Sequence, residues 1–185
     1  MSMEIGFAND VTNAQEKTRG SDGRLNVSSR TDNRMYYNSR DESQAFTVVW
    51  DDADSEAGDY VVSWKNTTAT GKTLVIEGIG VNAIQASSFK LAKVTGTAVG
   101  VAVTPFCLNQ AVPLTASATC VEAAGTAITG LTEEAVIDHA GCTATGHEEF
   151  RLRDGLRIGP AQTIAIEYER GTTGRTWGVI FGYYE

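Results

Sequence analysis

Hydrophobic and polar residues alternate along two stretches of this chain, AFTVVW at 45–50 and DYVVSWK at 59–65. A period of two places alternate side chains on opposite faces of a pleated strand. The connecting runs, DDADSEAGD (51–59) and NTTATGK (66–72), are rich in turn-forming residues. The pattern predicts antiparallel strands, each with one buried face. The residues expected on the buried faces are Phe46, Val48, Trp50, Tyr60, Val62 and Trp64.

Two further apolar runs, TLVIEGIGV (73–81) and SSFKLAKV (87–94), follow directly. Each is bounded by polar or small residues, as a strand would be. We therefore expect residues 45–94 to form a meander of antiparallel strands, and this meander to be the first sheet of a β-sandwich.

The C-terminal part of the chain has the same period. HEEFRLRDGLRI (147–158), QTIAIEYER (162–170) and RTWGVIFGYYE (175–185) predict three more strands, with GTTG (171–174) as a hairpin turn. Gly178 and Gly182, on the opposite parity of the last strand, indicate bulges or close backbone approach. The residues expected to be buried here are Phe150, Leu152, Ile164, Ile166, Tyr168, Trp177, Val179, Phe181 and Tyr183.

The middle of the chain has a different composition. Thr, Ala and Gly make up more than half of residues 95–130, and Glu122 is the only charged residue there. We expect short strands or an irregular loop, with a surface that is either interior or a contact surface. The run TEEAVIDHA (132–140) predicts one short helix, because Thr132 can cap it and two glutamates fall in its first turn.

Residues 1–41 contain few apolar residues and equal numbers of acidic and basic ones, so the whole net charge of −8 falls on residues 42–185. Such a segment buries little surface by itself. We expect an extended N-terminal arm, with short strands at 24–29 and 34–39, that is either a solvated leader or orders against a neighbouring subunit. The candidate partner-contact residues are Phe7, Arg19, Arg24, Arg30, Arg34, Met35, Tyr36 and Tyr37.

Taken together, the elements predict an all-β chain of eight to ten strands. For one domain of this length we expect a two-sheet β-sandwich of jelly-roll type at 42–185, preceded by the arm at 1–41.

Composition narrows the function classes. A net charge of −8 argues against a general nucleic-acid surface, which needs clustered Lys and Arg. No apolar run is long enough to span a membrane, and the N-terminal residues lack a signal-peptide pattern. The three cysteines are expected to be buried thiols in a reducing compartment, although a bridge between Cys107 and Cys120 stays open.

Two clusters could bind metals. His139, Cys142 and His147 are zinc-type ligands, but their spacing matches no known zinc pattern and no fourth ligand is evident. The acidic run 51–59 has alternating carboxylates, as in a calcium loop, but lacks the glycine and the final glutamate of one. A solvated turn is the alternative. We expect no cofactor, no metal and no catalytic residue.

Four runs of the chain carry a resemblance to a known family: DGRLNVSSRTDNRMYYNSRDESQAFTVVW, GDYVVSWKNTTATGKTLVI, HEEFRLRDGLRIG and GVIFGYYE. They resemble small jelly-roll structural proteins of tailed-bacteriophage virions, encoded among head and tail morphogenesis genes. The resemblance implies a non-enzymatic protein that cements or decorates a capsid by binding coat subunits or neighbouring virion proteins. It also implies a homo-oligomer, a trimer or dimer, assembled into virions in the host cytoplasm.

Two alternatives remain. A tail, baseplate or fibre component would have the same sandwich and a similar arm. A carbohydrate-binding β-sandwich module would expose its tryptophans, whereas Trp50, Trp64 and Trp177 share the parity of the apolar core positions.

Overall fold

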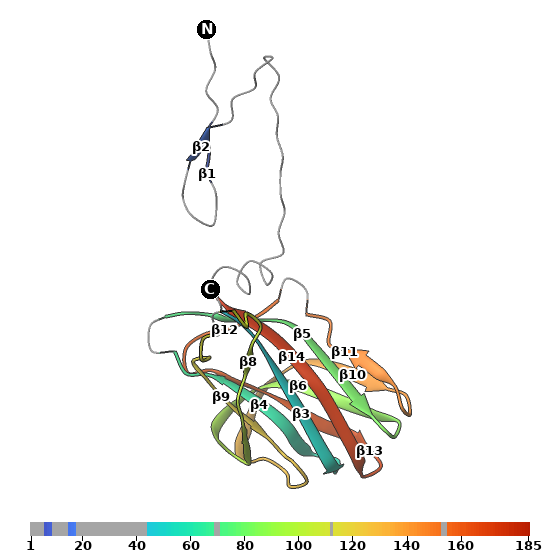
Figure 1. Ribbon diagram of the computed structural model, residues 1–185. Coiled ribbons are helices and arrows are strands. Elements are labelled where there is room, and N and C mark those ends of the chain that lie inside the picture. The colour runs from blue at the N-terminus through green and yellow to red at the C-terminus, as the bar shows by residue number, and fades with distance from the viewer. Residues whose placement is uncertain (1–5, 9–14, 18–43, 69–70, 112, 153–154) are drawn as a thin grey trace, which may run out of the picture. The chain divides into compact units, whose positions relative to one another are not determined.

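The computed structural model describes residues 6–8, 15–17, 44–68, 71–111, 113–152 and 155–185 (Figure 1). The chain separates into two compact units, Met1–Asp32 and Asn33–Glu185. In the first unit, strands β1 (Gly6–Ala8) and β2 (Gln15–Lys17) pair antiparallel. The strands expected at 24–29 and 34–39 lie outside the described residues.

The second unit is a β-sandwich of two six-stranded antiparallel sheets, and its described residues contain no helix. The β14 sheet has the order β11-β5-β14-β3-β8, with β12 also on β5, and the β13 sheet has the order β10-β6-β13-β4-β9-β7. The strands are β3 (Ala45–Ser55), β4 (Asp59–Asn66), β5 (Leu74–Ala83), β6 (Ser87–Val99), β7 (Val101–Val103), β8 (Phe106–Cys107), β9 (Ala118–Glu122), β10 (Thr129–Cys142), β11 (His147–Glu149), β12 (Leu156–Ile158), β13 (Thr163–Gly171) and β14 (Gly174–Tyr184).

The strand order is that of a jelly roll. If β11 and β12 together count as the sixth of eight principal strands, the β14 sheet has the order first, eighth, third, sixth. The β13 sheet has the order second, seventh, fourth, fifth. Each early strand thus pairs with a strand from the C-terminal half, as two interleaved Greek keys require. The expected fold class is confirmed.

The predicted meander is wrong, because consecutive strands alternate between the sheets. β3 and β5 belong to the β14 sheet, whereas β4 and β6 belong to the β13 sheet. An alternating pattern identifies a half-buried strand but carries no information about its neighbour. The sandwich also has more strands than the expected eight to ten, because its sixth strand is split and three short strands (β7, β8 and β9) are inserted between β6 and β10.

The core lies between the inner faces of the two sheets. Trp50 of β3 meets Phe89 of β6 edge to face across the sandwich, with ring centroids 6.4 Å apart. Phe89 in turn meets Tyr168 of β13 at 5.5 Å. The largest fully buried side chains are Trp50, Trp64, Tyr168, Phe46, Phe89, Leu74, Ile76, Ile79, Leu91, Ile166, Ile180 and Val48. The alternation in β3 and β13 therefore predicted the buried faces of these strands correctly.

In β4 the expected buried parity is correct for Val62 and Trp64 but wrong for Tyr60. The ladder between β13 and β4 shifts register between Ile166 and Glu167, so Val61 is an extra residue on β4. A bulge of this kind reverses the faces beyond it. Tyr60 consequently packs on the outer side of the sheet, against Ala165 and Val121 among others.

In β14 the predicted parity is inverted. Ile180 and Tyr184 point into the core, whereas Trp177, Val179 and Phe181 are only partly buried on the outer face. Tyr183 is buried, but in a small separate cluster with Ala45 and Val75. Two positions on the core side of β14, Gly178 and Gly182, are glycines, so most of the large apolar residues of this strand fall on the outer parity.

The predicted helix at 132–140 is wrong, because these residues lie in β10. This strand pairs with β6 along its whole length, with three register shifts. As an edge strand it is exposed at most positions, so its sequence lacks a clean period of two. Hydrogen bonding to β6 thus overrides a local helix preference, as tertiary context often does. The strand expected at 147–158 is split into β11 and β12, although Phe150 between them is buried as expected.

Candidate functional site

The predicted partner-contact residues lie almost entirely outside the described part of the chain. Of the set Phe7, Arg19, Arg24, Arg30, Arg34, Met35, Tyr36 and Tyr37, only Phe7 falls in a described element, β1. The structure therefore leaves the arm hypothesis as a prediction. The described residues contain a different candidate, on the outside of the β14 sheet.

The outer face of the β14 sheet carries three rows of cross-strand neighbours. In the first row Phe106 pairs with Thr47, Thr47 with Phe181, and Phe181 with Gly78. In the second, Val49 pairs with Val179, and Val179 with Gly80. In the third, Asp51 pairs with Trp177, and Trp177 with Asn82. The apolar members of these rows form what we call the β14 face: Val49, Phe106, Trp177, Val179 and Phe181.

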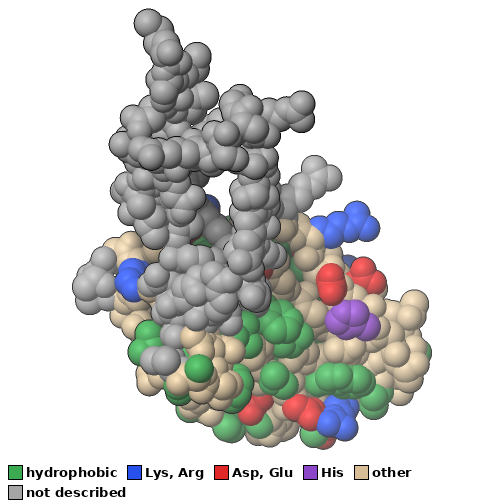
Figure 2. Space-filling view, turned by 45° about the horizontal axis from the view of Figure 1, so that its top comes forward, with side chains coloured by type: hydrophobic (Ala, Val, Ile, Leu, Met, Phe, Trp, Pro, Cys, Tyr) green, Lys and Arg blue, Asp and Glu red, His purple; other side chains and the backbone are tan. Residues whose placement is uncertain are grey.

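The apolar side chains of the β14 face are more exposed to solvent than apolar side chains in the core of the sandwich. Val49 is 64% exposed and Phe106 is 56% exposed, while the other three are half-buried. Figure 2 shows hydrophobic side chains gathered on one side of the sandwich, with charged side chains around them. A contiguous exposed apolar patch of a few hundred Å² on a folded domain is often an interaction site.

Glycines keep one side of this face flat. Gly78 and Gly80 of β5 stand beside Phe181 and Val179 and present no side chain to cover them. A Cβ at Gly80 would come within 2.7 Å of the His147 ring, so this histidine lies directly over the strand. His147 is held there through Nδ1, 3.0 Å from Oδ1 of Asn82. The apolar surface therefore ends at a polar rim on the β11 side.

A second polar contact, between Arg175 of β14 and Asp51 of β3, borders the β14 face on the β3 side. The Arg175 guanidinium forms a two-point ion pair with Asp51, and its carbon lies 5.6 Å from the centroid of the Trp177 ring. The hydrogen bonds from Arg175 hold the pKa of the Asp51 carboxyl below its usual value, although partial burial opposes this. An apolar centre with a paired, polar rim is the organisation of protein–protein interfaces.

The three residues considered as zinc ligands are not brought together. His139 lies on β10, with Nδ1 3.2 Å from the Glu169 carboxylate. His147 lies on β11 in the other sheet, and the Cys142 thiol is buried beside the carbonyl of Val81. Among the described residues no three His, Cys, Asp or Glu side chains are grouped as a metal site.

The acidic run 51–59 is not a single turn. Residues 51–55 continue β3, and only residues 56–58 separate it from β4. Asp52 is buried at 2% exposure, where its Oδ1 accepts a hydrogen bond from the Gly125 amide at 2.6 Å. Its Oδ2 accepts one from the Ser55 hydroxyl at 2.5 Å. The carboxylate therefore joins β3 to the turn before β10, which is a structural use of this residue.

The three cysteines are buried, and no disulfide joins them. The bridge left open between Cys107 and Cys120 is therefore absent. Burial raises the pKa of the Cys120 thiol, and burial together with the Glu148 charge raises the pKa of Cys142 to about 11. Thiols that stay protonated at neutral pH are poor nucleophiles.

No family model, curated protein or solved structure matches this chain. Within the described residues no helix is long and apolar enough to cross a membrane.

Sequence reasoning missed the β14 face because it placed Trp177, Val179 and Phe181 in the core. Trp50 and Trp64 are in the core as predicted, at 1% and 0% exposure. A signal was present: Gly178 and Gly182 share the other parity of β14. A glycine inside a strand often marks the close approach of another group, here Trp50 at Gly178.

Proposed function

We propose that this protein is a non-enzymatic structural protein of a tailed-phage virion, which binds assembled coat subunits as a capsid cement or decoration protein. The observation that carries the proposal is the exposed apolar β14 face with its paired polar rim. The resemblance of the sequence to jelly-roll virion proteins supports the choice of partner. The jelly-roll sandwich itself is compatible with this role and with others.

The size of the β14 face indicates how binding would work. Four strands spaced about 4.8 Å apart, and three rows about 7 Å apart, cover roughly 300 Å². A standard protein interface buries about 800 Å² on each partner. The face is therefore too small to act alone, and the N-terminal arm, residues 1–41, is the proposed source of the additional contact.

A cement protein of this kind acts by mass action. It binds the assembled lattice and not the free coat subunit, so its binding free energy adds to the stability of the shell. Repetition over many equivalent sites makes modest individual contacts firm, and assembly of the protein as a dimer or trimer multiplies them again.

The test is co-sedimentation with coat shells assembled without this protein. The double variant Val49→Glu/Phe106→Ser changes two strongly exposed residues of the β14 face and is expected to abolish binding while thermal unfolding is unchanged. The matched control is Val136→Glu, because Val136 is 44% exposed on β10 of the other sheet. Normal binding by the double variant, or equal loss in the control, would refute the proposal.

Position in the particle separates a head protein from a tail, baseplate or fibre component. Gold-labelled antibodies against the protein are expected to decorate heads of intact virions. Labels confined to tails would replace the cement role with the tail alternative while leaving the non-enzymatic structural role in place.

One observation favours a carbohydrate-binding module as a second candidate. Trp177 is half-exposed on a flat face, and such rings stack on sugars. Against it, the Arg175 guanidinium lies over the Trp177 ring and would have to move. Binding on a glycan array that is lost in Trp177→Ala would support this candidate, and a blank array would exclude the glycans it contains.

A further inference from the structure

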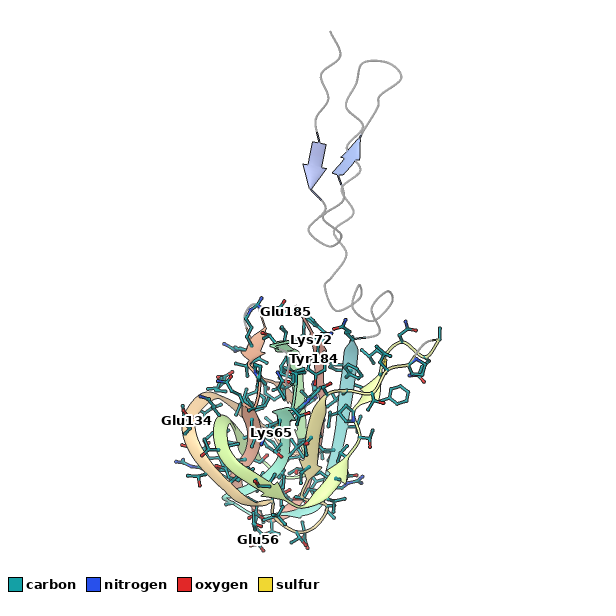
Figure 3. All side chains as sticks on the ribbon, turned by 90° about the vertical axis from the view of Figure 1, so that its left-hand side faces the viewer. Glu56, Lys65, Lys72, Glu134, Tyr184 and Glu185 are labelled. Carbon is teal, nitrogen blue, oxygen red and sulfur yellow. The ribbon has the colours of Figure 1, made fainter. Side chains whose placement is uncertain are left out.

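A pocket of about 150 Å³ lies on the outer side of the β13 sheet, opposite to the β14 face. Its floor is a cross-strand row in which Thr119 of β9 pairs with Lys65 of β4, and Lys65 pairs with Thr163 of β13. Ser63 adds a hydroxyl one position along the same face, and residues 96–98 of β6 form a wall. Figure 3 shows Lys65 beside the curved β6 and β10 pair. We call this the hydroxyl pocket.

The hollow lies where β6 continues beyond its pairing with β13. Val94 is the last residue of β6 that pairs with β13, at Thr163. Two residues later, Gly96 has a φ of 105°, a conformation that favours glycine. A Cβ at Gly96 would lie 2.1 Å from the Gly130 carbonyl oxygen, so the β6 and β10 backbones touch there. The end of this strand pair thus curls over the sheet (Figure 3), and small side chains beneath it leave space.

The pocket contains hydrogen-bond donors that lack acceptors. Ser63 is 2% exposed and Thr163 is 4% exposed, yet neither hydroxyl has a partner among the described residues. Neither oxygen is among the fully enclosed side-chain atoms that lack a partner, so both are open to the pocket. The two hydroxyls are therefore available to a molecule that enters it.

Lys65 adds a positive charge without a local counter-charge. Among the lysines whose side chains are described, Lys90 and Lys93 form ion pairs with glutamates. Lys72 donates to the amide oxygen of Gln44. Lys65 alone in this set has no such partner, although it is half-buried and no carboxylate lines its pocket. A lysine without an acidic partner is available to a negatively charged ligand.

The chemistry of the lining defines the ligand. An ammonium and several hydroxyls favour a group that is rich in acceptors and negatively charged. The volume corresponds to roughly five water molecules at about 30 Å³ each, which accommodates a carboxylate or a phosphate but not a nucleotide. We propose that the hydroxyl pocket binds a small oxyanion, a carboxylate or phosphate group, through Lys65, Ser63 and Thr163.

The test is an NMR titration of the full-length protein with sodium phosphate and, separately, with sodium acetate, at constant ionic strength. Saturable shifts of the amides at 63–65, 96–98 and 163 are expected with at least one anion, with a millimolar dissociation constant. The anion that binds more tightly identifies the oxyanion class. Absence of saturation with both anions would overturn the proposal.

Variants test the assignment to this pocket. Lys65→Met and Ser63→Ala are each expected to weaken binding about tenfold, because each removes a charge-assisted contact. Lys72→Met, a lysine outside the pocket, is the control and should bind as the wild type does. Unchanged unfolding temperatures establish that the variants are folded. Equal binding by Lys65→Met and the wild type would show that the anion associates elsewhere and would refute the site.

Discussion

Gly178 of β14 lies directly against the indole ring of Trp50 on the neighbouring strand β3. A Cβ at position 178 would lie 2.8 Å from two ring carbons and 2.3 Å from the carbonyl oxygen of Gly80. The absence of a side chain at 178 therefore allows Trp50 to fill the core side of the β14 sheet. Trp177 and Val179, on the opposite parity of the strand, lie on the outer side of the sheet.

We predict that Gly178→Ala destabilises the domain by about 1–3 kcal/mol, because an overpacked core must displace side chains or backbone. The measurement is thermal or denaturant unfolding, in which each kcal/mol lowers the midpoint temperature by about 2–4 °C for a chain of this size. Gly141→Ala is the control, since nothing lies within 4 Å of a Cβ at that position of β10. Equal effects of the two variants would contradict the packing argument.

The buried Asp52 carboxylate should matter more for stability than its exposed neighbours. Asp52→Ala leaves the Gly125 amide without its acceptor and breaks the hydrogen bond from Ser55, which in turn contacts the Thr176 hydroxyl at 2.6 Å. We expect a loss of about 2–4 kcal/mol. Asp54→Ala, at an exposed position of the same strand, should change stability by less than about 0.5 kcal/mol. If calcium stabilised the wild type, and did so through Asp52 and Asp54, the structural assignment would fail.

Lys90 gives a pH-dependent prediction. Its Nζ lies 2.6 Å from Glu133 and 2.8 Å from Glu167, with only 15% of the side chain exposed. Burial acts to lower the pKa of Lys90, but hydrogen bonds and charges of the two glutamates outweigh it and raise the pKa above its usual 10.5. We expect Lys90→Met to cost roughly 1–3 kcal/mol at neutral pH. Lys93→Met, which breaks a more exposed pair with Glu134, should cost less.

The sign of the pH dependence follows from the raised pKa. The contribution of Lys90 is fully present below the unfolded-state pKa of 10.5 and is lost as the pH rises through the higher folded-state value. The stability difference between the wild type and Lys90→Met should therefore stay constant from pH 7 to about pH 10 and shrink only above it. A difference that already shrinks between pH 7 and pH 9 would show that the ammonium is not the stabilising group.

Deletion of residues 1–35 tests the arm. The sandwich strands begin at Ala45, and the first compact unit ends at Asp32, so the remaining domain should fold. We expect the truncated protein to unfold at nearly the wild-type temperature and to have lost co-sedimentation with coat shells. If the truncated protein still binds particles, the arm hypothesis is wrong and the binding contacts lie in residues 36–185.

Sequence patterns predicted most of the strands but not their partners. The alternation in β3 and β13 is regular, so Phe46, Trp50 and Ile166 could be placed in the core from sequence. Bulges made the same prediction wrong elsewhere. At Val61 in β4, one extra residue exchanges the buried and exposed faces of the strand. In β10, register shifts and edge exposure removed the period altogether and left a spurious helix signal.

Neither candidate site could be assembled from sequence alone. The β14 face depends on which strands lie beside β14, and the jelly-roll crossings that set this are long-range. The hydroxyl pocket combines Ser63, Lys65 and Thr163 with a β6 segment that reaches it only because the chain turns at Gly96. The outward parity of Ser63 and Lys65 in β4 is readable in the sequence, but their enclosure is not.

The bulged edge strand β10 has a consequence for how copies of this protein associate. Its register shifts and its charged residues spoil it as a template for a strand from another molecule, and the strands at the opposite ends of the sheets, β7 and β8, are only three and two residues long. Edge-to-edge polymerisation of the sheets is thereby discouraged. Association is left to the broad faces of the sandwich, which can close into finite rings without growing into fibres.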